Sequence, residues 1–444
     1  MERREAVIWF YSLTKTAEKK NQSGGTKMSK TKPFAISMRL VSMAYQKVKS
    51  NKGAGGIDGI SLEQFDKDYR NHLYRLWNRM SSGSYIPPPV KLTEIPKKGG
   101  GLRPLGIPTI SDRIAQTIVR GLLEPELELI FHKDSYGYRP GRSAHQALSC
   151  ARDRCWSRNW VVDMDIQGCF DNIPHDLLMR AVRQHCKTKW MLLYIERWLK
   201  VPLQKVNGEI IERTKGVPQG SVIGPLLSNL FLHYCMDKWL EVNYSGCPFE
   251  RYADDALIHC SSMLEAEEVK QAISTRLSSC GMALHAEKTY VVYCKDSNRR
   301  HPGVAKKSFD FLGYTFRPRM AQNSQRGVWF TNWLPAVSRK ALSSMNKAMR
   351  KWQVFHQTTI TLQEVSAFIN PILRGWIRYY GKFYKAKLTN YMHIVDVKLA
   401  TWARRKYKHL RSSEMKAIRW LHSVYLRQPK LFVHWELLGS KPTV

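Results

Sequence analysis

Two adjacent aspartates inside an apolar, strand-like run constrain the fold of this chain more than any other feature. The tetrapeptide Tyr252-Ala253-Asp254-Asp255 follows Phe249 and precedes Ala256-Leu257-Ile258. Charged groups leave water only when hydrogen bonds or a counter-charge compensate them. A tight hairpin over residues 250–260 would place the carboxylates at its turn, where a divalent cation can reach them. Taken alone, the tetrapeptide is equally compatible with a chance acidic turn, so its meaning depends on the rest of the sequence.

A second acidic group lies in an earlier predicted strand, over residues 160–166. Alternation along this strand puts Asp163 and Asp165 on one face. Asp165 ends the strand, and it can share metal ions with Asp254 and Asp255. Two divalent ions held by carboxylates suit phosphoryl transfer, because one activates an attacking hydroxyl and the other stabilises the leaving group. We read Asp163 as a structural residue or as one that supports the metal ligands without binding the ions itself.

The charge of the chain points to a polyanionic partner. Its 444 residues include 71 Lys and Arg against 36 Asp and Glu, a formal net charge of +35, and nucleic acid is the first candidate partner. The chain contains no run of 18 apolar residues, so neither a transmembrane helix nor a membrane partner is expected. Nine cysteines without Cys-x-x-Cys spacing predict reduced thiols in a cytoplasmic protein, rather than disulfides or zinc ligands.

Strand and helix patterns alternate without a strict βαβ repeat, which predicts an α+β fold. Helices are expected over residues 62–80, 114–130, 175–185, 191–199, 221–240 and 264–280. Strands are expected over residues 90–96 and 102–107, around a glycine turn at 97–101, and over residues 160–166 and 285–294. A hairpin over residues 201–213 would turn at Asn207-Gly208.

The character of the chain changes after about residue 330. Residues 331–444 contain 21 Lys and Arg but only 4 Asp and Glu, with aromatic residues interleaved among the cations. This pattern predicts helices that pack through their aromatic rings and present cations to RNA or DNA. The alternative is an ordinary solvated helical face.

Several sequence blocks follow one another in the order found in a known family. Asp165 to Phe170, Gly216-Val217-Pro218-Gln219-Gly220 and the segment Tyr252–Asp255 resemble the palm of a reverse transcriptase. Residues 35–440 together resemble bacterial group II intron-encoded proteins, which are reverse transcriptases fused to a maturase domain. The blocks that narrow the resemblance are Ile57-Asp58-Gly59, Ile95-Pro96-Lys97, Arg103-Pro104-Leu105-Gly106-Ile107-Pro108, residues 136–145 (YGYRPGRSAH), Phe311-Leu312-Gly313-Tyr314 and residues 370–376 (NPILRGW).

The resemblance implies a right-hand polymerase with fingers, palm and thumb, followed by a helical maturase domain. Residues 1–32 would be a flexible basic extension, 33–320 the fingers and palm, and 321–410 the thumb and maturase (domain X) helices. Residues 411–444 would be a basic C-terminal segment. Because no metal-binding cysteine pairs follow, the chain resembles the subgroup that lacks the HNH endonuclease domain.

The implied activity is RNA-directed DNA polymerisation from dNTPs on a primer-template, with two Mg²⁺ ions as cofactors. The implied partner is a group II intron RNA, which the protein helps to splice and copies into DNA during retromobility. A domesticated reverse transcriptase in phage defence or DNA repair is an alternative. Another is an RNA chaperone with a decayed polymerase, against which the intact aspartates argue.

The resemblance also assigns roles to individual residues. Asp165, Asp254 and Asp255 would be the catalytic metal ligands, assisted by the main-chain carbonyl of Ile166. Phe170 would lie under the sugar and exclude a 2′-hydroxyl. Gln219 would lie near the nucleotide, and Lys97 and Arg103 would bind the triphosphate. Lys288 would be a proton donor to pyrophosphate or an ordinary surface lysine, and Arg139 and Arg142 would hold the template or the fold. The residues that would bind RNA are Arg374, Arg378, Lys382, Lys385, Arg404 and Arg405.

Overall fold

The computed structural model describes residues 32–96, 102–294, 296, 298, 306–322 and 327–438. The chain forms two compact units, within these described ranges. One unit is made of the described residues within 1–147 and 162–290, and the other of the described residues within 148–161 and 291–444. The predicted basic extension up to residue 31 and the glycine turn that carries Lys97 lie outside the described residues.

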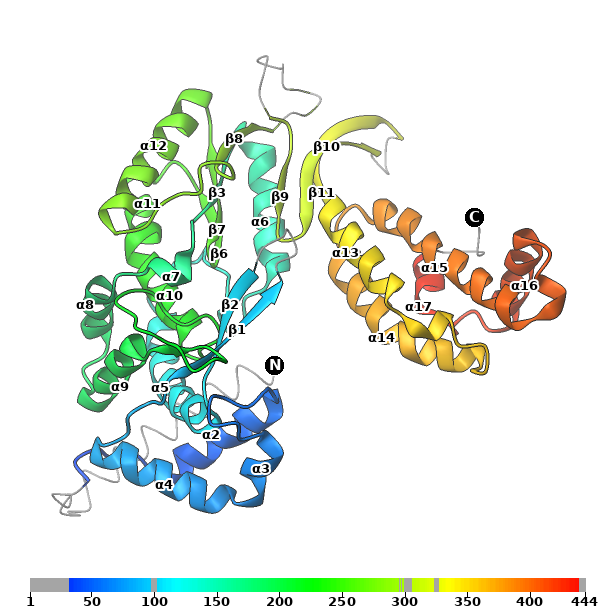
Figure 1. The fold of residues 1–444 in the computed structure, drawn as a ribbon. Helices are drawn as coiled ribbons and strands as arrows, with labels where there is room; N and C mark the ends of the chain where they lie inside the picture. Colours follow the sequence, from blue (N-terminus) through cyan, green and yellow to red (C-terminus); the bar gives the residue numbers. More distant parts are fainter. Residues whose placement is uncertain are drawn as a thin grey trace. The chain divides into compact units, whose positions relative to one another are not determined.

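A four-stranded sheet with the order β6-β7-β3-β8 carries the acidic segments (Figure 1). Its strands are β6 (Phe249–Tyr252), β7 (Asp255–Cys260), β3 (Trp160–Asp165) and β8 (Tyr290–Tyr293). Antiparallel pairing of Tyr252 with Asp255 leaves Ala253 and Asp254 as a two-residue turn. The predicted acidic hairpin is therefore confirmed, as is the strand that ends at Asp165.

The strand predicted over residues 285–294 is wrong at its beginning. Strand β8 begins only at Tyr290, because residues 286–288 form a turn in which the Lys288 N–H donates to the His285 carbonyl. This turn is anchored to the end of β3 by a hydrogen bond from the His285 N–H to the Asp165 carbonyl, 2.8 Å. The turn moves Lys288 out of a strand and beside Asp165.

A second sheet has the order β2-β1-β4-β5. Strands β1 (Val90–Pro96) and β2 (Leu102–Ile107) pair antiparallel, as predicted. Strands β4 (Leu203–Gln204) and β5 (Ile210–Ile211) form the predicted hairpin, and β4 pairs parallel to β1. This sheet brings the segment after Pro202 beside β1.

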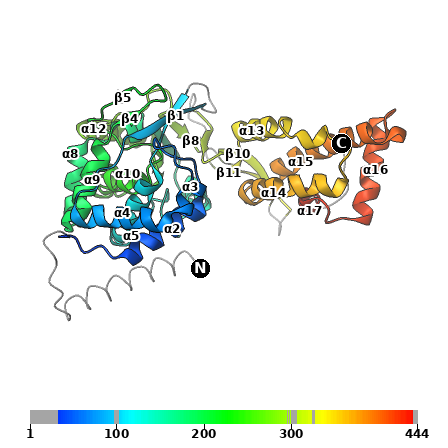
Figure 2. The ribbon, with the colours of Figure 1, turned by 60° about the horizontal axis from the view of Figure 1, so that its bottom comes forward.

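Helices surround these sheets in the first unit (Figures 1 and 2). Helix α12 (Met263–Ser279) packs against β7, and α2 packs against α5. The helices predicted over 114–130, 175–185, 191–199 and 264–280 are confirmed, with ends displaced by a few residues. The helical elements of this unit are α2 (Met38–Asn51), α3 (Leu62–Lys67), α4 (Tyr69–Ser82), α5 (Ile110–Glu128), α7 (Cys169–Asn172), α8 (His175–His185), α9 (Lys189–Lys200), α10 (Gly224–Leu232) and α11 (Lys238–Asn243).

Two predicted helices are interrupted. The helix expected over 62–80 breaks at Asp68, whose backbone leaves the helical region at φ −129°. The helix expected over 221–240 begins at Gly224, where the Ser221 hydroxyl accepts the Gly224 N–H at 2.9 Å. It then passes through a π-helical turn, His233–Asp237, before α11. Such turns insert one extra residue and are frequent at functional sites.

The second unit combines a three-stranded sheet with a helical bundle. The sheet has the order β11-β10-β9, from β9 (Phe309–Phe311), β10 (Tyr314–Gln322) and β11 (Trp329–Val337). Helices α13 to α17 form the bundle (Figure 2). They share one apolar core, in which Trp402 and Trp435 are fully buried. Their bounds are α13 (Arg339–Arg350), α14 (Leu362–Tyr380), α15 (Lys385–Lys406), α16 (Glu414–Arg427) and α17 (Val433–Leu438), while α6 (Ala144–Ser157) enters this unit at Leu148.

Within the described part of the chain, every helix is too short or too polar to span a lipid bilayer.

Candidate active site

The three predicted catalytic carboxylates converge at one edge of the β6-β7-β3-β8 sheet. Asp165 ends β3, Asp254 occupies the hairpin turn, and Asp255 begins the neighbouring strand β7. The Asp165 and Asp255 side chains lie within hydrogen-bonding reach of each other, and Asp254 adds its negative charge. The pairing of β7 with β3 thus brings together residues that are far apart in the sequence.

The electrostatics of this cluster call for a positive charge. The surrounding protein, followed by the charges of Asp254 and Asp165, raises the pKa of Asp255 to about 7, although this residue is exposed. Burial, followed by the charge of Asp165, also raises the pKa of Asp254. Carboxylates that repel one another at a water-accessible edge fit divalent cations with oxygen ligands. These residues therefore have the donor chemistry of a Mg²⁺ site.

Two further predicted residues lie at the cluster. The Lys288 ammonium donates to Asp165 Oδ2 at 2.8 Å and partly neutralises that carboxylate. Ile166 forms a β-bridge with Leu284, but the two hydrogen bonds of the bridge are made by Asp165 and Gln167 on either side. The Ile166 carbonyl oxygen therefore accepts neither hydrogen bond of this bridge.

A buried network that the sequence analysis did not identify holds the hairpin turn. The Arg251 guanidinium donates through Nε and Nη2 to both Asp237 oxygens, at 2.7 and 2.6 Å, and neither side chain is exposed. Its Nη1 donates to the Ala253 carbonyl at 3.1 Å and to Asn229 Oδ1 at 3.0 Å. Asn229 in turn donates to the Gly137 carbonyl at 2.7 Å. Arg251 directly precedes the tetrapeptide, and that position was the only available sequence signal.

Gly137 allows the chain to approach this turn closely. A Cβ at this position would lie 2.3 Å from the Ala253 nitrogen, so a larger residue would displace the turn. Ala253 has φ +60°, in the left-handed region that few non-glycine residues adopt. The turn is therefore fixed by packing on one side and by the Arg251 network on the other.

Gln219 links two parts of the predicted nucleotide site. Its Oε1 accepts from Arg103 Nε at 2.7 Å, and its Nε2 donates to Asp171 Oδ2 at 3.0 Å. Its carbonyl accepts the Gly106 N–H of β2 at 2.6 Å, and the Val217 N–H donates to the Phe170 carbonyl at 2.7 Å. The predicted partners Arg103, Phe170 and Gln219 are thus brought together, whereas Lys97 lies outside the described residues.

Tyr138 is a second aromatic residue at this site that the sequence analysis gave no role. Its ring meets the ring of Phe170 edge to face, with centroids 6.3 Å apart. Tyr138 has φ +58°, a conformation that costs a bulky residue about 1–2 kcal/mol. Burial and then the charge of Asp254 raise the pKa of its hydroxyl, while Arg103 lowers it. The side chain therefore lies in the electric field of the aspartates.

A cavity of about 290 Å³ adjoins the Gln219 loop, lined by Asp171, Arg213 and Lys215 among others. Burial lowers the pKa of Arg213 to about 10, and the charge of Asp171 opposes that shift. Two cations in a concave site beside the nucleotide residues suit a backbone phosphate.

The predicted RNA-binding cations of the second unit fall into two groups. Four of these cations are exposed. Arg374 and Arg378 lie one turn apart on α14, and Lys382 and Lys385 lie where α14 leads into α15. Arg404 donates to the Arg411 carbonyl at 3.2 Å, and Arg405 donates to the Phe355 carbonyl at 3.2 Å. The first four are thus oriented to solvent, whereas Arg404 and Arg405 also support the fold of their own unit.

Arg139 also supports the fold. It donates to both oxygens of Glu128 and, through Nη1, to the carbonyls of His132 and Ser135, at 2.7 and 2.8 Å. These contacts agree with the structural half of its predicted role.

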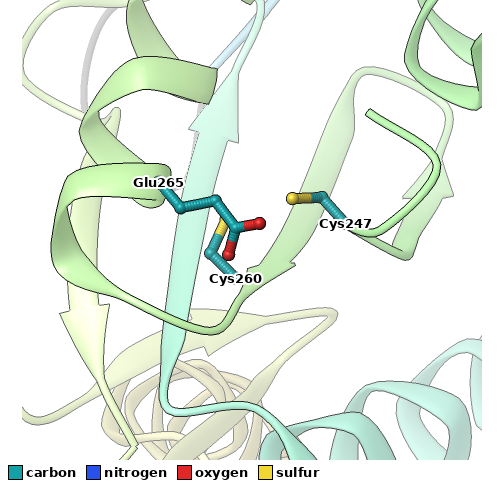
Figure 3. A group of neighbouring side chains, drawn as sticks. All are labelled: Cys247, Cys260 and Glu265. Atoms are coloured by element: carbon teal, nitrogen blue, oxygen red, sulfur yellow. The ribbon is translucent and has the colours of Figure 1, made fainter. Parts of the chain in front are cut away.

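A different cluster, Cys247, Cys260 and Glu265, lies near the opposite end of β7 from Asp255 (Figure 3). Its two thiols and one carboxylate lie within 4.8 Å of one another, and Glu265 Oε2 accepts the Ser261 N–H. Among the described residues, the aspartates are not packed this closely. Sulfur ligands favour zinc over Mg²⁺, so this cluster has the wrong chemistry for phosphoryl transfer.

Comparisons with known proteins agree with this geometry. Residues 95–316, half of the chain, match the family "Reverse transcriptase (RNA-dependent DNA polymerase)". Residues 342–420 match "Group II intron, maturase-specific domain". The first match contains all the candidate catalytic residues, and the second lies within the helical bundle.

Three relatives illustrate the similarity. Group II intron-encoded protein LtrA of Lactococcus lactis subsp. cremoris is 37% identical over 199 residues, covering 45% of this chain and 33% of LtrA. Protein YkfC of Escherichia coli is 37% identical over 205 residues, covering 44% of this chain and 52% of YkfC. The putative COX1/OXI3 intron 2 protein of Saccharomyces cerevisiae is 28% identical over 302 residues, covering 68% of this chain and 34% of that protein.

A solved telomerase structure from Candida albicans is a more distant likeness, with a TM-score of 0.45 and 11% identity, covering 85% of this chain and 68% of that chain. The matches to the three curated relatives span between one third and about half of their lengths. The family match and the α+β architecture correspond to a right-hand polymerase followed by a helical domain. The chain belongs to the reverse transcriptase family and carries the maturase-specific domain of group II intron-encoded proteins.

Proposed function

We propose that this protein is an RNA-directed DNA polymerase that also acts as a maturase for a group II intron RNA. The observation that carries the polymerase is the convergence of Asp165, Asp254 and Asp255 at one sheet edge, inside the reverse transcriptase match. The reaction joins a primer 3′-hydroxyl to the α-phosphate of a dNTP and releases pyrophosphate. The fingers, palm, thumb and maturase boundaries at residues 32, 320 and 410 remain part of this proposal.

The carboxylates and the Ile166 carbonyl would hold two Mg²⁺ ions, which activate the primer hydroxyl and stabilise the charge on the phosphates. Lys288 donates a hydrogen bond to Asp165 and faces the same edge of the sheet. Arg103, held by Gln219, supplies a guanidinium for the triphosphate, which Arg binds through its planar fork. We assign Lys97 the same task, and Phe170 the exclusion of a 2′-hydroxyl.

The maturase assignment rests on the family match over residues 342–420 and on the cations of the bundle. Arg374, Arg378, Lys382 and Lys385 would contact phosphates of the intron RNA, with Arg404 and Arg405 in part. The intron RNA itself would perform the splicing chemistry, and the protein would favour its active fold. We also propose a cytoplasmic location, as expected for nine cysteines in the reduced thiol state.

A paired substitution tests the polymerase. Asp254→Asn combined with Asp255→Asn should abolish DNA synthesis on a primed RNA template, because the ions lose two ligands, while RNA binding stays within about twofold. Glu209→Gln, at an exposed carboxylate in the β4–β5 hairpin, is the matched control and should retain synthesis. Synthesis by the doubly substituted protein would refute the site assignment.

Splicing tests the maturase separately. Precursor RNA containing the intron should splice faster at low Mg²⁺ when the protein is present, and the doubly substituted protein should accelerate it equally. No acceleration by either protein would leave a polymerase without a maturase role.

A further inference from the structure

Tyr138 is held from both sides by anchored neighbours, although its own side chain is 48% exposed. On one side, Gly137 is wedged against the Ala253 nitrogen and its carbonyl accepts from Asn229. On the other side, Arg139 is fixed by Glu128 and by two backbone carbonyls. The strained backbone at φ +58° is therefore imposed by the surrounding structure.

Strain of this kind is concentrated at functional sites, where neighbouring contacts maintain it. An exposed aromatic ring at a left-handed backbone position contributes little to a hydrophobic core, so the presence of tyrosine there calls for another reason. Glycine would adopt this backbone without strain. The place of the ring supplies the reason, because its edge-to-face partner is Phe170 and the charges of Asp254 and Arg103 act on its hydroxyl.

We propose that Tyr138 is a positioning residue that fixes the ring of Phe170 and thereby sets the discrimination between deoxyribonucleotides and ribonucleotides. This inference rests on the proposed polymerase function and on the sugar-side role of Phe170 within it. Phe170 is only partly buried and lies in the short helix α7, so core packing alone does not fix its ring. The Tyr138 ring supplies a perpendicular wall, and the Arg251 and Asn229 network couples that wall to the hairpin turn.

The coupling has a structural consequence for sugar selection. A 2′-hydroxyl is excluded only if the Phe170 ring cannot rotate away when a ribonucleotide enters. Without the Tyr138 ring, the Phe170 ring loses its neighbour on this side and can rotate away from the 2′-hydroxyl. Contacts of this size in a pocket change discrimination by roughly 10- to 200-fold.

The test is single-nucleotide incorporation on a primed template, with kcat/KM measured for a dNTP and the matching rNTP. Tyr138→Ala and Tyr138→Gly should each lower the dNTP-to-rNTP ratio by about tenfold or more, mainly by improving rNTP use. Tyr138→Phe keeps the ring and should stay within about twofold of the wild-type ratio. Tyr138→Gly also relieves the backbone strain, so it should unfold at a temperature no lower than Tyr138→Ala.

Phe170→Ala provides the reference for a thermodynamic cycle. If Tyr138 acts through Phe170, then Tyr138→Ala combined with Phe170→Ala should discriminate no worse than Phe170→Ala alone. A wild-type ratio in Tyr138→Ala, or fully additive losses in the double variant, would overturn the inference. Failure of the wild-type protein to incorporate any dNTP would instead overturn the proposed polymerase function.

Discussion

The Arg251–Asp237 pair shows how single buried residues set the geometry of the aspartates. Both side chains are fully buried, and Arg251 also binds the Ala253 carbonyl in the hairpin turn. Removing one partner of a buried ion pair leaves an uncompensated charge and costs about 3–5 kcal/mol. Replacing both partners with apolar residues of similar size is often close to neutral. Stability and turn geometry can therefore be separated by substitution.

We expect Arg251→Met to destabilise the protein strongly, and Arg251→Met with Asp237→Leu to regain most of the lost stability. DNA synthesis by the double variant should nevertheless remain slower than that of the wild type, because no group replaces the guanidinium that donates to the Ala253 carbonyl and to Asn229. Denaturant midpoints and primer extension measure the two properties. Recovery of wild-type synthesis together with stability would show that the turn does not need Arg251.

These residues also show what the sequence could reveal about the site. Asp165, Asp254 and Asp255 were predictable because each is a costly charge in an apolar strand pattern. Arg251 is one of 71 Lys and Arg, and Asp237 falls in an apolar helix where a lone acid is easily read as surface. Tyr138 looks ordinary in sequence, because its significance lies in a backbone angle and a ring contact.

At the scale of elements, the loop around Gln219 depends on a glycine at which any larger residue would clash with neighbouring backbone. Gly220 has φ +104°, and a Cβ there would lie 2.4 Å from the Gly106 carbonyl oxygen of β2. Gly208, in the β4–β5 hairpin, has φ +88° but nothing within 4 Å of a Cβ. The two positions share the backbone strain of a substitution and differ only in the clash.

Gly220→Ala should therefore lower kcat/KM for dNTP incorporation by about 100-fold, since a displacement near 1 Å at a reacting site has that effect. Gly208→Ala should cost only the strain of about 1–2 kcal/mol and should keep its incorporation rate. Steady-state incorporation kinetics and thermal unfolding measure both variants. Equal kinetic losses in the two variants would attribute the effect to strain rather than to the clash.

Asp112 joins three elements through its buried carboxylate. It accepts hydrogen bonds from Tyr85, from Trp198 on α9 and from Gln116 on α5. Burial raises its pKa to about 6 from an ordinary value of 3.8, and the three donors only partly offset that effect. The folded protein therefore holds this proton more tightly than the unfolded chain does. The stability from this proton is complete below about pH 4 and is lost as the pH rises through 6.

We expect the stability of the wild type relative to Asp112→Asn to fall on going from pH 4 to pH 7, by an amount on the order of 3 kcal/mol. The variant also carries a constant cost, because its amide nitrogen would face the Gln116 amide that donates to Asp112. Denaturant titrations at several pH values measure the difference. A difference that is independent of pH would show that Asp112 is ionised across this range in the folded protein.

Element boundaries were less predictable than element types. The apolar pattern over residues 221–240 is continuous, so it gives no sign of the π-helical turn that contains Asp237. The alternating pattern over residues 285–294 likewise conceals the turn that brings Lys288 to Asp165. In both places a tertiary contact to the acidic site outweighs the local pattern.

At the scale of the whole molecule, composition and motif order predicted a basic helical segment that follows the part carrying the acidic site. From Arg339 on, the basic, aromatic segment forms a helical bundle with a buried aromatic core, as expected, whereas residues 331–337 belong to strand β11. The compact units nonetheless do not follow the linear sequence, because Leu148–Val161 belongs with residues after 290. Such long-range assignments depend on packing between distant segments, which a single sequence does not display.

The exposed arginines of α14 are expected to contribute to RNA binding by the bundle. Arg374 and Arg378 lie one turn apart on α14 and are exposed, so both can reach phosphates of one RNA strand. Each phosphate contact releases counterions and adds about 0.7–0.9 to the slope of log K against log salt. Arg374→Ala with Arg378→Ala should therefore reduce this slope by about 1.4–1.8.

The matched control removes the same charge elsewhere. Lys205→Ala with Lys238→Ala removes a partly exposed and an exposed lysine of the other unit, each paired with a glutamate, at 2.9 and 2.8 Å. If the RNA contacts α14, the control keeps the wild-type slope, because counterions are released only where phosphates are bound. Equal slopes for the two double variants would mean that affinity follows total charge alone, and that the intron RNA does not engage this face of the bundle.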